Sequence, residues 1–331
     1  MNYHQSEDFK DAVRACAEKM HLREIFIEKD YWVTNVLKQL SQSKYATQVV
    51  FKGGTSLSKA YDCIYRFSED IDLAIIPGEH SGAKLKALLK AVSTDITKGL
   101  TNIPGHALEV KLGRNRTTVY QYERKIESLD FGVVKDIILL EVNCFTNPVP
   151  SCMKQVQSYL GKYLQENDFK EDVEKYGLEP FDIQVLALER TFFEKLLSIN
   201  RLSYEGIDKL KEKIRHFYDI YQLLQVPDFK ERIFTLEYVE ILDQALADDA
   251  ANPTMEGEWK GKRLSSSPLF TELEATWSNL EPVYSSGLAE LLMQGELPAS
   301  KLVLAELKSI KDFLLTYDEN NDKKKTGGDN D

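Results

Sequence analysis

Apolar positions along the chain follow two spacings, and the balance between them changes near residue 150. Before that point, segments with an apolar residue every three or four positions, typical of amphipathic helices, alternate with short runs typical of strands. Helices are predicted over residues 8–20, 25–42, 56–64 and 83–100. Strands are predicted over residues 47–52, 68–76, 106–113, 117–124 and 134–145. The turn-forming sequence Asn-Pro-Val-Pro at 147–150 then ends this pattern.

Helical spacing prevails after residue 150. Helices are predicted over residues 156–165, 185–202, 208–225, 234–247, 284–294 and 299–318, with a surface loop over 250–268. The last residues, 319–331, lack apolar side chains and are predicted to be disordered. The pattern therefore predicts an α+β protein with a small mixed β-sheet and flanking helices in residues 1–148, an α-helical domain in residues 149–318 and a disordered tail.

Composition and charge exclude several classes of protein. Of the 331 residues, 43% are hydrophobic and 29% are charged, which is ordinary for a globular protein. No apolar run approaches the ~20 residues of a membrane-spanning helix, and the first residues lack the apolar core of a signal peptide. We therefore expect a cytoplasmic protein without a membrane partner. The four cysteines and five histidines lack CxxC and HExxH spacing, which gives no support to a zinc site.

Two aspartates stand one residue apart in the apolar run over residues 68–76. On a strand, Asp70 and Asp72 point to one face while Ile71 and Leu73 point to the other, which packs. Neighbouring carboxylates repel each other unless a cation lies between them. Mg²⁺ binds carboxylate oxygens together with phosphate oxygens, and a pair of such ions ~4 Å apart can stabilise a leaving pyrophosphate. The alternative is an exposed edge strand that happens to carry two aspartates.

A glycine pair precedes this strand. Gly53 and Gly54 follow the predicted strand over 47–52 and precede a predicted helix, for which Thr55 is a plausible N-cap. Glycine lets the backbone approach a ligand closely, and a helix start offers free N–H groups and a positive dipole end. Thr55 and Ser56 add hydroxyl donors. If the strands over 47–52 and 68–76 are neighbours, this phosphate cradle and the carboxylate pair face one space.

A third acidic residue, Glu141, lies in the β-rich run over residues 134–145. It shares a face with Leu139 and Asn143 if this run is a strand. A carboxylate among apolar side chains is costly unless it is paired or binds a metal ion. We expect Glu141 to complete the metal-binding set, and the alternative is a strand end that reaches the surface.

The order of these motifs resembles the AbiEii/AbiGii toxin family within the nucleotidyltransferase superfamily. Five stretches carry the resemblance: IEKDYWVTNVL at 27–37, GGTSLSK at 53–59, FSEDIDL at 67–73, ERTFFEKLLSINR at 189–201 and RHFYDIYQL at 215–223. One departure is that Gly54-Thr55-Ser56 replaces the plain Gly-Ser of the superfamily, so that either hydroxyl could contact phosphate. The resemblance implies a nucleotidyltransferase-like sheet, whose active site the helical domain completes.

The resemblance also implies an activity and the residues that perform it. The family transfers a nucleotidyl group from an NTP with Mg²⁺ (or Mn²⁺), and members act as toxins of toxin–antitoxin or abortive-infection systems that defend against phage. The expected partners are the NTP, an RNA acceptor such as the tRNA 3′ end, and an antitoxin on a separate chain. The expected site residues are Asp70, Asp72 and Glu141 for metal, Lys195 and Asp219 for catalysis, and Gly53, Gly54, Thr55, Ser56, Lys59 and Arg66 for the nucleotide.

Some interpretations stay open at this point. Asp219 could form only a surface ion pair with Arg215, four positions before it on the same helix face. Arg66 could bind phosphate or be an exposed turn residue, and Arg190 with Glu194 is interpreted as a structural pair. A non-catalytic NTP- or RNA-binding protein, or a kinase-like enzyme that transfers the γ-phosphoryl group, would keep the same pocket.

Overall fold

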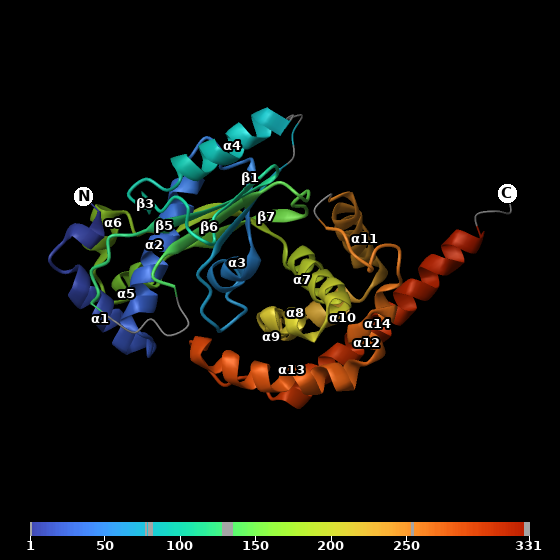
Figure 1. Ribbon diagram of the computed structural model, residues 1–331. Coiled ribbons are helices and arrows are strands. Elements are labelled where there is room, and N and C mark those ends of the chain that lie inside the picture. Colours follow the sequence, from blue (N-terminus) through green and yellow to red (C-terminus); the bar gives the residue numbers. More distant parts are fainter. Residues whose placement is uncertain (1, 77, 79–81, 128–134, 253–254, 328–331) are drawn as a thin grey trace. The chain divides into compact units, whose positions relative to one another are not determined.

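A computed structural model describes residues 2–76, 78, 82–127, 135–252 and 255–327 (Figure 1). The chain divides into two compact units, Met1–Ala187 and Leu188–Asp331. This division comes later than the predicted boundary after residue 148. The reason is that two strands after residue 150, absent from the prediction, belong to the sheet of the first unit.

The first unit is built on one eight-stranded mixed sheet. Its main path runs β3-β5-β6-β2-β1-β8-β7, and β4 pairs with β5. The β2–β6 and β1–β8 pairs are parallel, whereas the other neighbours are antiparallel. The strands are β1 (Val49–Lys52), β2 (Ile71–Ile75), β3 (Thr101–Asn102), β4 (Val110–Leu112), β5 (Asn115–Gln121), β6 (Ile138–Asn143), β7 (Ser151–Val156) and β8 (Phe181–Leu186).

Helices cover this sheet, and Figure 1 shows α2, α3 and α4 around it. Helix α2 packs against β8, α3 against β1 and β2, and α4 against β5 and β6. The helical elements are η1 (Tyr3–Gln5), α1 (Phe9–Met20), α2 (Glu24–Ser41), α3 (Gly53–Lys59), α4 (Gly82–Asp95), α5 (Tyr159–Glu166) and α6 (Lys170–Tyr176). As predicted, Ile71, Leu73 and Ile75 of β2 are buried. The prediction of Thr55 as the N-cap is wrong, because α3 begins at Gly53 and its N-cap is Lys52.

The second unit is helical around an aromatic core. Helix α7 packs against α9 and α11, and α14 packs against α9 and α13. Phe192, Phe217 and Trp277 are buried between these helices. The elements are α7 (Leu188–Leu202), η2 (Ser203–Glu205), α8 (Ile207–Glu212), α9 (Ile214–Leu224), α10 (Phe229–Ile233), α11 (Leu236–Ala251), η3 (Leu264–Ser266), α12 (Pro268–Thr271), α13 (Leu273–Gly287), η4 (Ala289–Leu291) and α14 (Ser300–Gly327).

Several predicted elements of this half need correction. The single helix over 208–225 is two helices, α8 and α9, separated at Lys213. The prediction of one helix over 284–294 is wrong, because α13 ends at Gly287 and the short helix η4 follows it. Part of the predicted loop over 250–268 forms η3 and the start of α12, and residues 253–254 lie outside the described residues.

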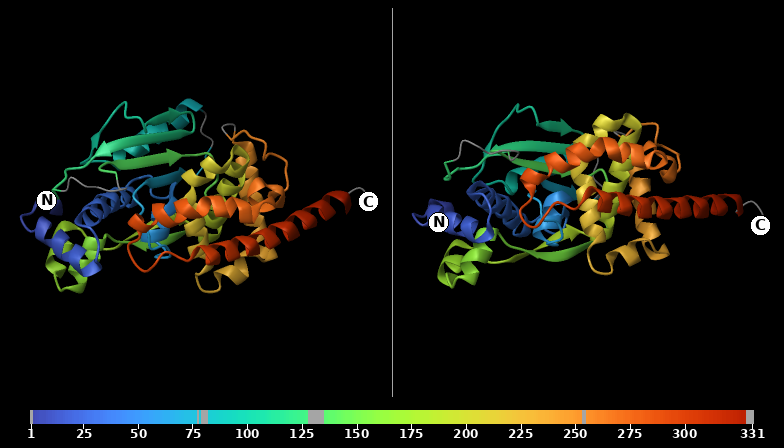
Figure 2. Two further views of the ribbon diagram at one scale, coloured as in Figure 1. Left: turned by 60° about the horizontal axis from the view of Figure 1, so that its bottom comes forward. Right: turned by 90° about the horizontal axis from the view of Figure 1, so that it is seen from below.

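The C-terminal helix is longer than predicted. Helix α14 continues to Gly327, so the disordered tail is wrong for residues 319–327, and residues 328–331 lie outside the described part (Figure 2). Figure 2 shows α14 as one long helix with α13 beside it. Across the described ranges, no helix is both long and apolar enough to cross a membrane.

Candidate active site

Strand register brings the three predicted acidic residues to one region of the sheet. In the parallel β2–β6 pair, Asp72 lies directly opposite Glu141. Asp70 comes just before β2, two positions from Asp72, and so shares its face. The other neighbour of β2 is β1, where Lys52 pairs with Asp72 and leads directly into Gly53. The predicted adjacency of the glycine pair, the Asp pair and Glu141 is therefore confirmed.

The carboxylates of Asp70 and Glu141, on either side of Asp72, each have a neighbouring hydrogen-bond donor. Lys135 Nζ lies 3.2 Å from Asp70 Oδ1, and Asn143 Nδ2 donates to Glu141 Oε1 at 3.0 Å. Asp70 and Lys135 are both partly exposed. As the described side chains stand, no three Asp, Glu, His or Cys residues are grouped closely enough to hold a metal ion. A divalent cation would therefore have to draw these side chains together.

The donor chemistry nevertheless fits such a cation. Asp72 on β2, Glu141 on β6 and Asp70 just before β2 offer the hard oxygen ligands that Mg²⁺ and Mn²⁺ prefer. The present partners of Asp70 and Glu141 are an ammonium and an amide, which carboxylates exchange readily at a partly exposed position. Asp70, Asp72 and Glu141 are therefore the residues that would hold the cation.

The backbone at Gly53 touches the central carboxylate. A Cβ added to Gly53 would lie 2.1 Å from Asp72 Oδ2, and Gly53 has a φ of +80°. Both facts favour glycine here, because side chains rarely adopt this backbone conformation and none would fit. Gly54 is crowded in the same way by Arg66 Nη2, at 2.8 Å, and by Ser68 Oγ, at 2.9 Å. The loop that the sequence assigns to phosphate therefore lies directly against Asp72 and Arg66.

The hydroxyls of Thr55 and Ser56 have other contacts. Thr55 donates to the Asp70 carbonyl at 2.5 Å, and its oxygen lies 3.0 Å from Ser68 Oγ. Ser56 donates to the Gly53 carbonyl at 2.9 Å. Both side chains are fully buried. The Ser56 bond stays within α3, whereas the Thr55 bond ties α3 to Asp70, the residue just before β2.

The two predicted cationic residues for the nucleotide lie in different environments. Arg66 is buried, donates to the Phe67 carbonyl at 3.2 Å and lies against Gly54, so the exposed-turn alternative is wrong. Lys59 forms a buried ion pair with Asp30 and lies 5.1 Å from the centre of the Tyr159 ring. Burial lowers the pKa of Lys59, and the nearby Asp30 opposes this effect. As placed, Lys59 is directed toward Asp30.

Three consecutive charged residues of α2 are buried. Glu28, Lys29 and Asp30 are each at most 5% exposed, whereas the sequence marked them only as part of a family-like block. Glu28 accepts from the Lys125 and Ile126 backbone N–H groups, and burial raises its pKa. Their signal in the sequence is the charged triplet itself, which interrupts an otherwise apolar helix. Such residues are rarely buried unless each has a partner.

Lys29 links α2 to the carboxylate region. Its Nζ lies 2.5 Å from Glu69 Oε2 and also donates to the Lys135 carbonyl. Glu69 is the neighbour of Asp70 and also accepts from the Lys135 N–H at 3.2 Å. Burial lowers the pKa of Lys29, while Glu69 opposes the shift. Both Lys135 and this buried connection were missed by the sequence analysis, because they depend on contacts between distant segments.

The second unit contains the other two predicted catalytic residues. Lys195 Nζ of α7 and Asp219 Oδ2 of α9 lie 2.8 Å apart. The Asp219 side chain is completely buried and that of Lys195 is 8% exposed, so the alternative of a surface ion pair at Asp219 is wrong. Arg190 pairs with Glu194 at 3.2 Å, as predicted, and also with Asp248 at 2.5 Å.

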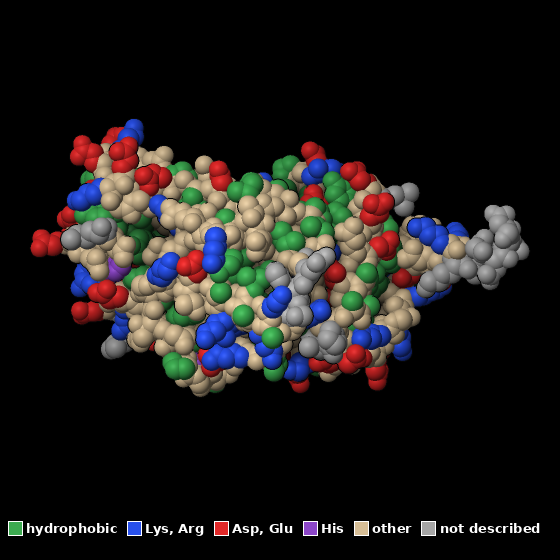
Figure 3. All heavy atoms as spheres, turned by 90° about the horizontal axis from the view of Figure 1, so that it is seen from above, with side chains coloured by type: hydrophobic (Ala, Val, Ile, Leu, Met, Phe, Trp, Pro, Cys, Tyr) green, Lys and Arg blue, Asp and Glu red, His purple; other side chains and the backbone are tan. Residues whose placement is uncertain are grey.

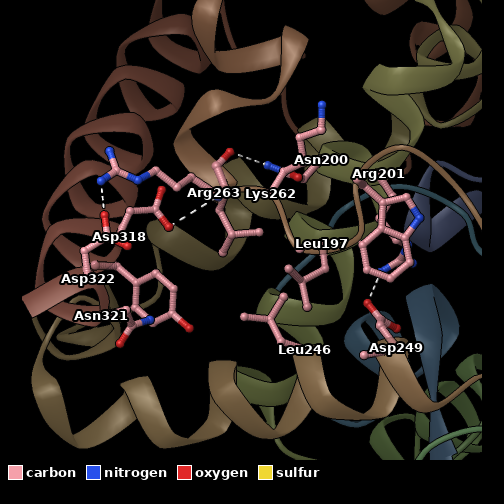
Figure 4. Close-up of a pocket in the computed structure, with 15 residues that line it drawn as sticks. Leu197, Asn200, Arg201, Leu246, Asp249, Lys262, Arg263, Asp318, Asn321 and Asp322 are labelled. Atoms are coloured by element: carbon pink, nitrogen blue, oxygen red, sulfur yellow. Dashed lines mark hydrogen bonds and ion pairs between the residues drawn. The ribbon is translucent and has the colours of Figure 1, made fainter. Parts of the chain in front are cut away.

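This unit also contains a cavity of about 300 Å³ (Figure 4). Arg201 pairs with Asp249 at one side and lies 5.7 Å from the centre of the Trp259 ring. At the other side Asp318 accepts from the Ser265 N–H at 2.8 Å. None of the predicted site residues lines it. Because these charged groups satisfy one another, we assign no ligand to this cavity.

The strand register therefore gathers the glycine pair and the acidic residues at one region of the sheet. The family model described as "Nucleotidyl transferase AbiEii toxin, Type IV TA system" matches residues 35–306. The chain therefore belongs to the AbiEii nucleotidyltransferase toxin family. The match includes Gly53, Asp72, Lys195 and Asp219, and it extends beyond residue 223, where the recognisable motifs ended.

Two further comparisons were made. A search of curated proteins gave no match. Among solved structures, the nucleotidyltransferase toxin MenT4 from Mycobacterium tuberculosis H37Rv is 15% identical, with a TM-score of 0.39. The similarity covers 92% of this chain and 98% of that one. At this TM-score the likeness adds nothing to the family assignment.

Proposed function

We propose that this toxin transfers a nucleoside monophosphate from an NTP to an RNA acceptor, in a reaction that depends on Mg²⁺ or Mn²⁺. The observation that carries the proposal is the register of β2 and β6. It places Asp72 opposite Glu141, with Asp70 on the same face and Gly53 in contact with Asp72. A toxin of a type IV toxin–antitoxin family supplies the biological setting.

In the proposed mechanism an acceptor hydroxyl attacks the α-phosphorus in line, and pyrophosphate leaves. Asp70, Asp72 and Glu141 would hold the cation, which would supply charge neutralisation at the phosphates and favour ionisation of the attacking hydroxyl. The Gly53-Gly54 backbone gives the triphosphate close access to these carboxylates. Arg66, fixed against Gly54, supplies positive charge to the phosphates. Catalysis then consists mainly of positioning and charge neutralisation.

The family resemblance also leads us to propose that Lys195 and Asp219 take part in the reaction. Lys195 Nζ and Asp219 Oδ2 lie 2.8 Å apart in a buried pair. We propose that Lys195 contacts the triphosphate and that Asp219 holds its ammonium in place. This role rests on the family resemblance.

The proposed acceptor is the 3′ end of tRNA, and the proposed biological role is abortive infection under control of a separate antitoxin chain. The net charge of −11 argues against a uniformly basic RNA-binding surface. Figure 3 nevertheless shows Lys and Arg side chains gathered at places on one face, where they alternate with acidic ones. Local contacts of this kind suit an acceptor that is bound at its end.

The experiment that tests the proposal combines the purified protein, Mg²⁺, bacterial tRNA and each NTP labelled at the α-phosphate. We expect label to move onto RNA with one or two of the four NTPs. Asp72→Asn removes a carboxylate charge at constant shape and should lower the rate at least about a hundredfold. Asp95→Asn, at the end of α4 in a surface pair with Lys98, is the matched control and should retain full activity.

Other outcomes separate the alternatives. Transfer only from γ-labelled NTP would establish phosphoryl transfer instead, and label on protein would change the acceptor. NTP binding without any transfer would favour the non-catalytic interpretation. Normal transfer by a folded Asp72→Asn protein would disprove the metal assignment.

A further inference from the structure

Lys135 occupies a position at the carboxylate group that no sequence motif indicated. Its Nζ lies 3.2 Å from Asp70 Oδ1, and the two side chains are 39% and 35% exposed. A pair with this much exposure is screened by water and contributes little to stability. The contact can therefore break and form again without disturbing the fold.

The backbone of residue 135 is held much more firmly than its side chain. Glu69 accepts from the Lys135 N–H at 3.2 Å, and Lys29 donates to the Lys135 carbonyl. Glu69 and Lys29 pair with each other and are almost completely buried, at 6% and 1% exposure. The ammonium of Lys135 is thus attached by a flexible stem to a fixed point beside Asp70.

The position of Lys135 beside Asp70 balances the negative charge of the carboxylates. Asp70, Asp72 and Glu141 share one region of the sheet, and their mutual repulsion needs a positive charge nearby. Lys135 supplies such a charge at Asp70. A divalent cation that binds Asp70 must compete with this ammonium for the same oxygen.

We propose that Lys135 is an additional substrate-binding residue of the transfer reaction. It covers Asp70 until a divalent cation binds, and the displaced ammonium then contacts a phosphate oxygen of the NTP that shares this cation. The proposal rests on the function proposed above, because it assumes that Asp70 is a metal ligand. Lys29 and Glu69 act as positioning residues, since they fix the point from which the Lys135 side chain moves.

Mn²⁺ binding in the absence of nucleotide tests the first part, by electron paramagnetic resonance of the free ion. Lys135→Met removes the competing charge from a partly exposed position, so the protein should fold normally. We expect Mn²⁺ to bind about two- to five-fold more tightly, the range that corresponds to a weak ion pair. Lys135→Arg should behave like the wild type. Lys98→Met, which removes the exposed partner of Asp95, is the control for a general change in net charge.

The steady-state kinetics of transfer test the second part. Loss of a phosphate contact made in both the ground and transition states raises KM more than it lowers kcat. We expect the KM for NTP to rise about tenfold in Lys135→Met at saturating Mg²⁺, and Lys135→Arg to restore most of the loss. A Lys135 with a merely structural role would change neither the Mn²⁺ affinity nor this KM.

The outcomes distinguish this proposal from the function on which it rests. If the wild type binds no Mn²⁺, the metal assignment fails and the role of Lys135 falls with it. If the wild type binds Mn²⁺ and Lys135→Met has the same affinity, only the role of Lys135 is disproved. An equal tightening in Lys98→Met would show a non-local charge effect and would also overturn it.

Discussion

Gly53 has no side chain, and the Asp72 carboxylate fills the space that one would need. A Cβ at this position would lie 2.1 Å from Asp72 Oδ2. Any other residue would therefore have to push this carboxylate away from its place opposite Glu141. Glycine at this point is thus a requirement of the site as well as of the backbone.

Comparing Gly53→Ala with a matched control variant separates the requirement of the backbone from that of the site. Gly99 has a similar φ of +90°, but nothing lies within 4 Å of a Cβ added there. Alanine should cost about 1–2 kcal/mol of backbone strain at either position. Only Gly53→Ala should also displace Asp72, and we expect it to lower transfer about a hundredfold more than Gly99→Ala. Urea unfolding and the α-label assay measure the two effects.

A different result would be informative. Equal activity of the two variants at equal stability would mean that the position of Asp72 does not matter for transfer, contrary to its proposed role.

At the level of single residues, the sequence predicted which face the carboxylates share but not what surrounds them. Strand periodicity is a local property, so Asp70 and Asp72 could be placed from their spacing alone. The directions of the Thr55 hydroxyl and of the Arg66 and Lys59 side chains depend on contacts far along the chain. No local pattern contains that information.

Among the elements, α2 shows how a helix can be anchored by buried charges. Glu28, Lys29 and Asp30 point in different directions around the helix and reach three separate segments. Asp30 pairs with Lys59 and accepts from the Tyr159 N–H at 2.7 Å, which ties α2 to α3 and to the start of α5. The Asp30–Lys59 pair thereby holds α3, whose first residue is Gly53.

The Asp30–Lys59 pair gives a test of stability against function. Asp30→Asn or Lys59→Met alone leaves one buried charge without its partner and should cost about 3–5 kcal/mol of unfolding free energy. The double variant removes both charges and should recover much of this loss in urea unfolding. If Lys59 acts only in this ion pair, the double variant should transfer nucleotide at close to the wild-type rate.

A different outcome would support the role at the nucleotide that the sequence predicts for Lys59. A folded double variant with a greatly raised KM for NTP would show that Lys59 contacts the nucleotide.

Strands β7 and β8 show why the sheet was underestimated. In β8, Ile183 and Val185 alternate with polar residues, but the apolar run continues directly into α7, so its end was interpreted as helix. Its parallel partner β1 is distant in sequence and gives no local signal.

The length of the C-terminal helix α14 was underestimated for another reason. Lengthening an existing helix needs no new nucleus, so even a polar segment can continue it.

In the whole molecule, each of the two compact units contains a buried Lys–Asp pair. Asp30 and Lys59 belong to the first unit, and Lys195 and Asp219 to the second. The two pairs have the same chemistry and similar burial, so their loss should have similar effects on stability. Only the second pair is proposed to act on the nucleotide.

Replacing both members of the Lys195–Asp219 pair allows a comparison of the two pairs in stability and in transfer. Lys195→Met alone removes the ammonium from the completely buried Asp219 and should cost about 3–5 kcal/mol. Lys195→Met with Asp219→Asn should recover much of that stability in urea unfolding but should stay at least about a hundredfold below the wild type in transfer. The Asp30→Asn/Lys59→Met protein is the control, equal in the type of pair removed. If both double variants fold and both transfer normally, the Lys195–Asp219 pair takes no part in catalysis. Loss of transfer only in the Lys195→Met/Asp219→Asn protein would show that catalysis requires this pair.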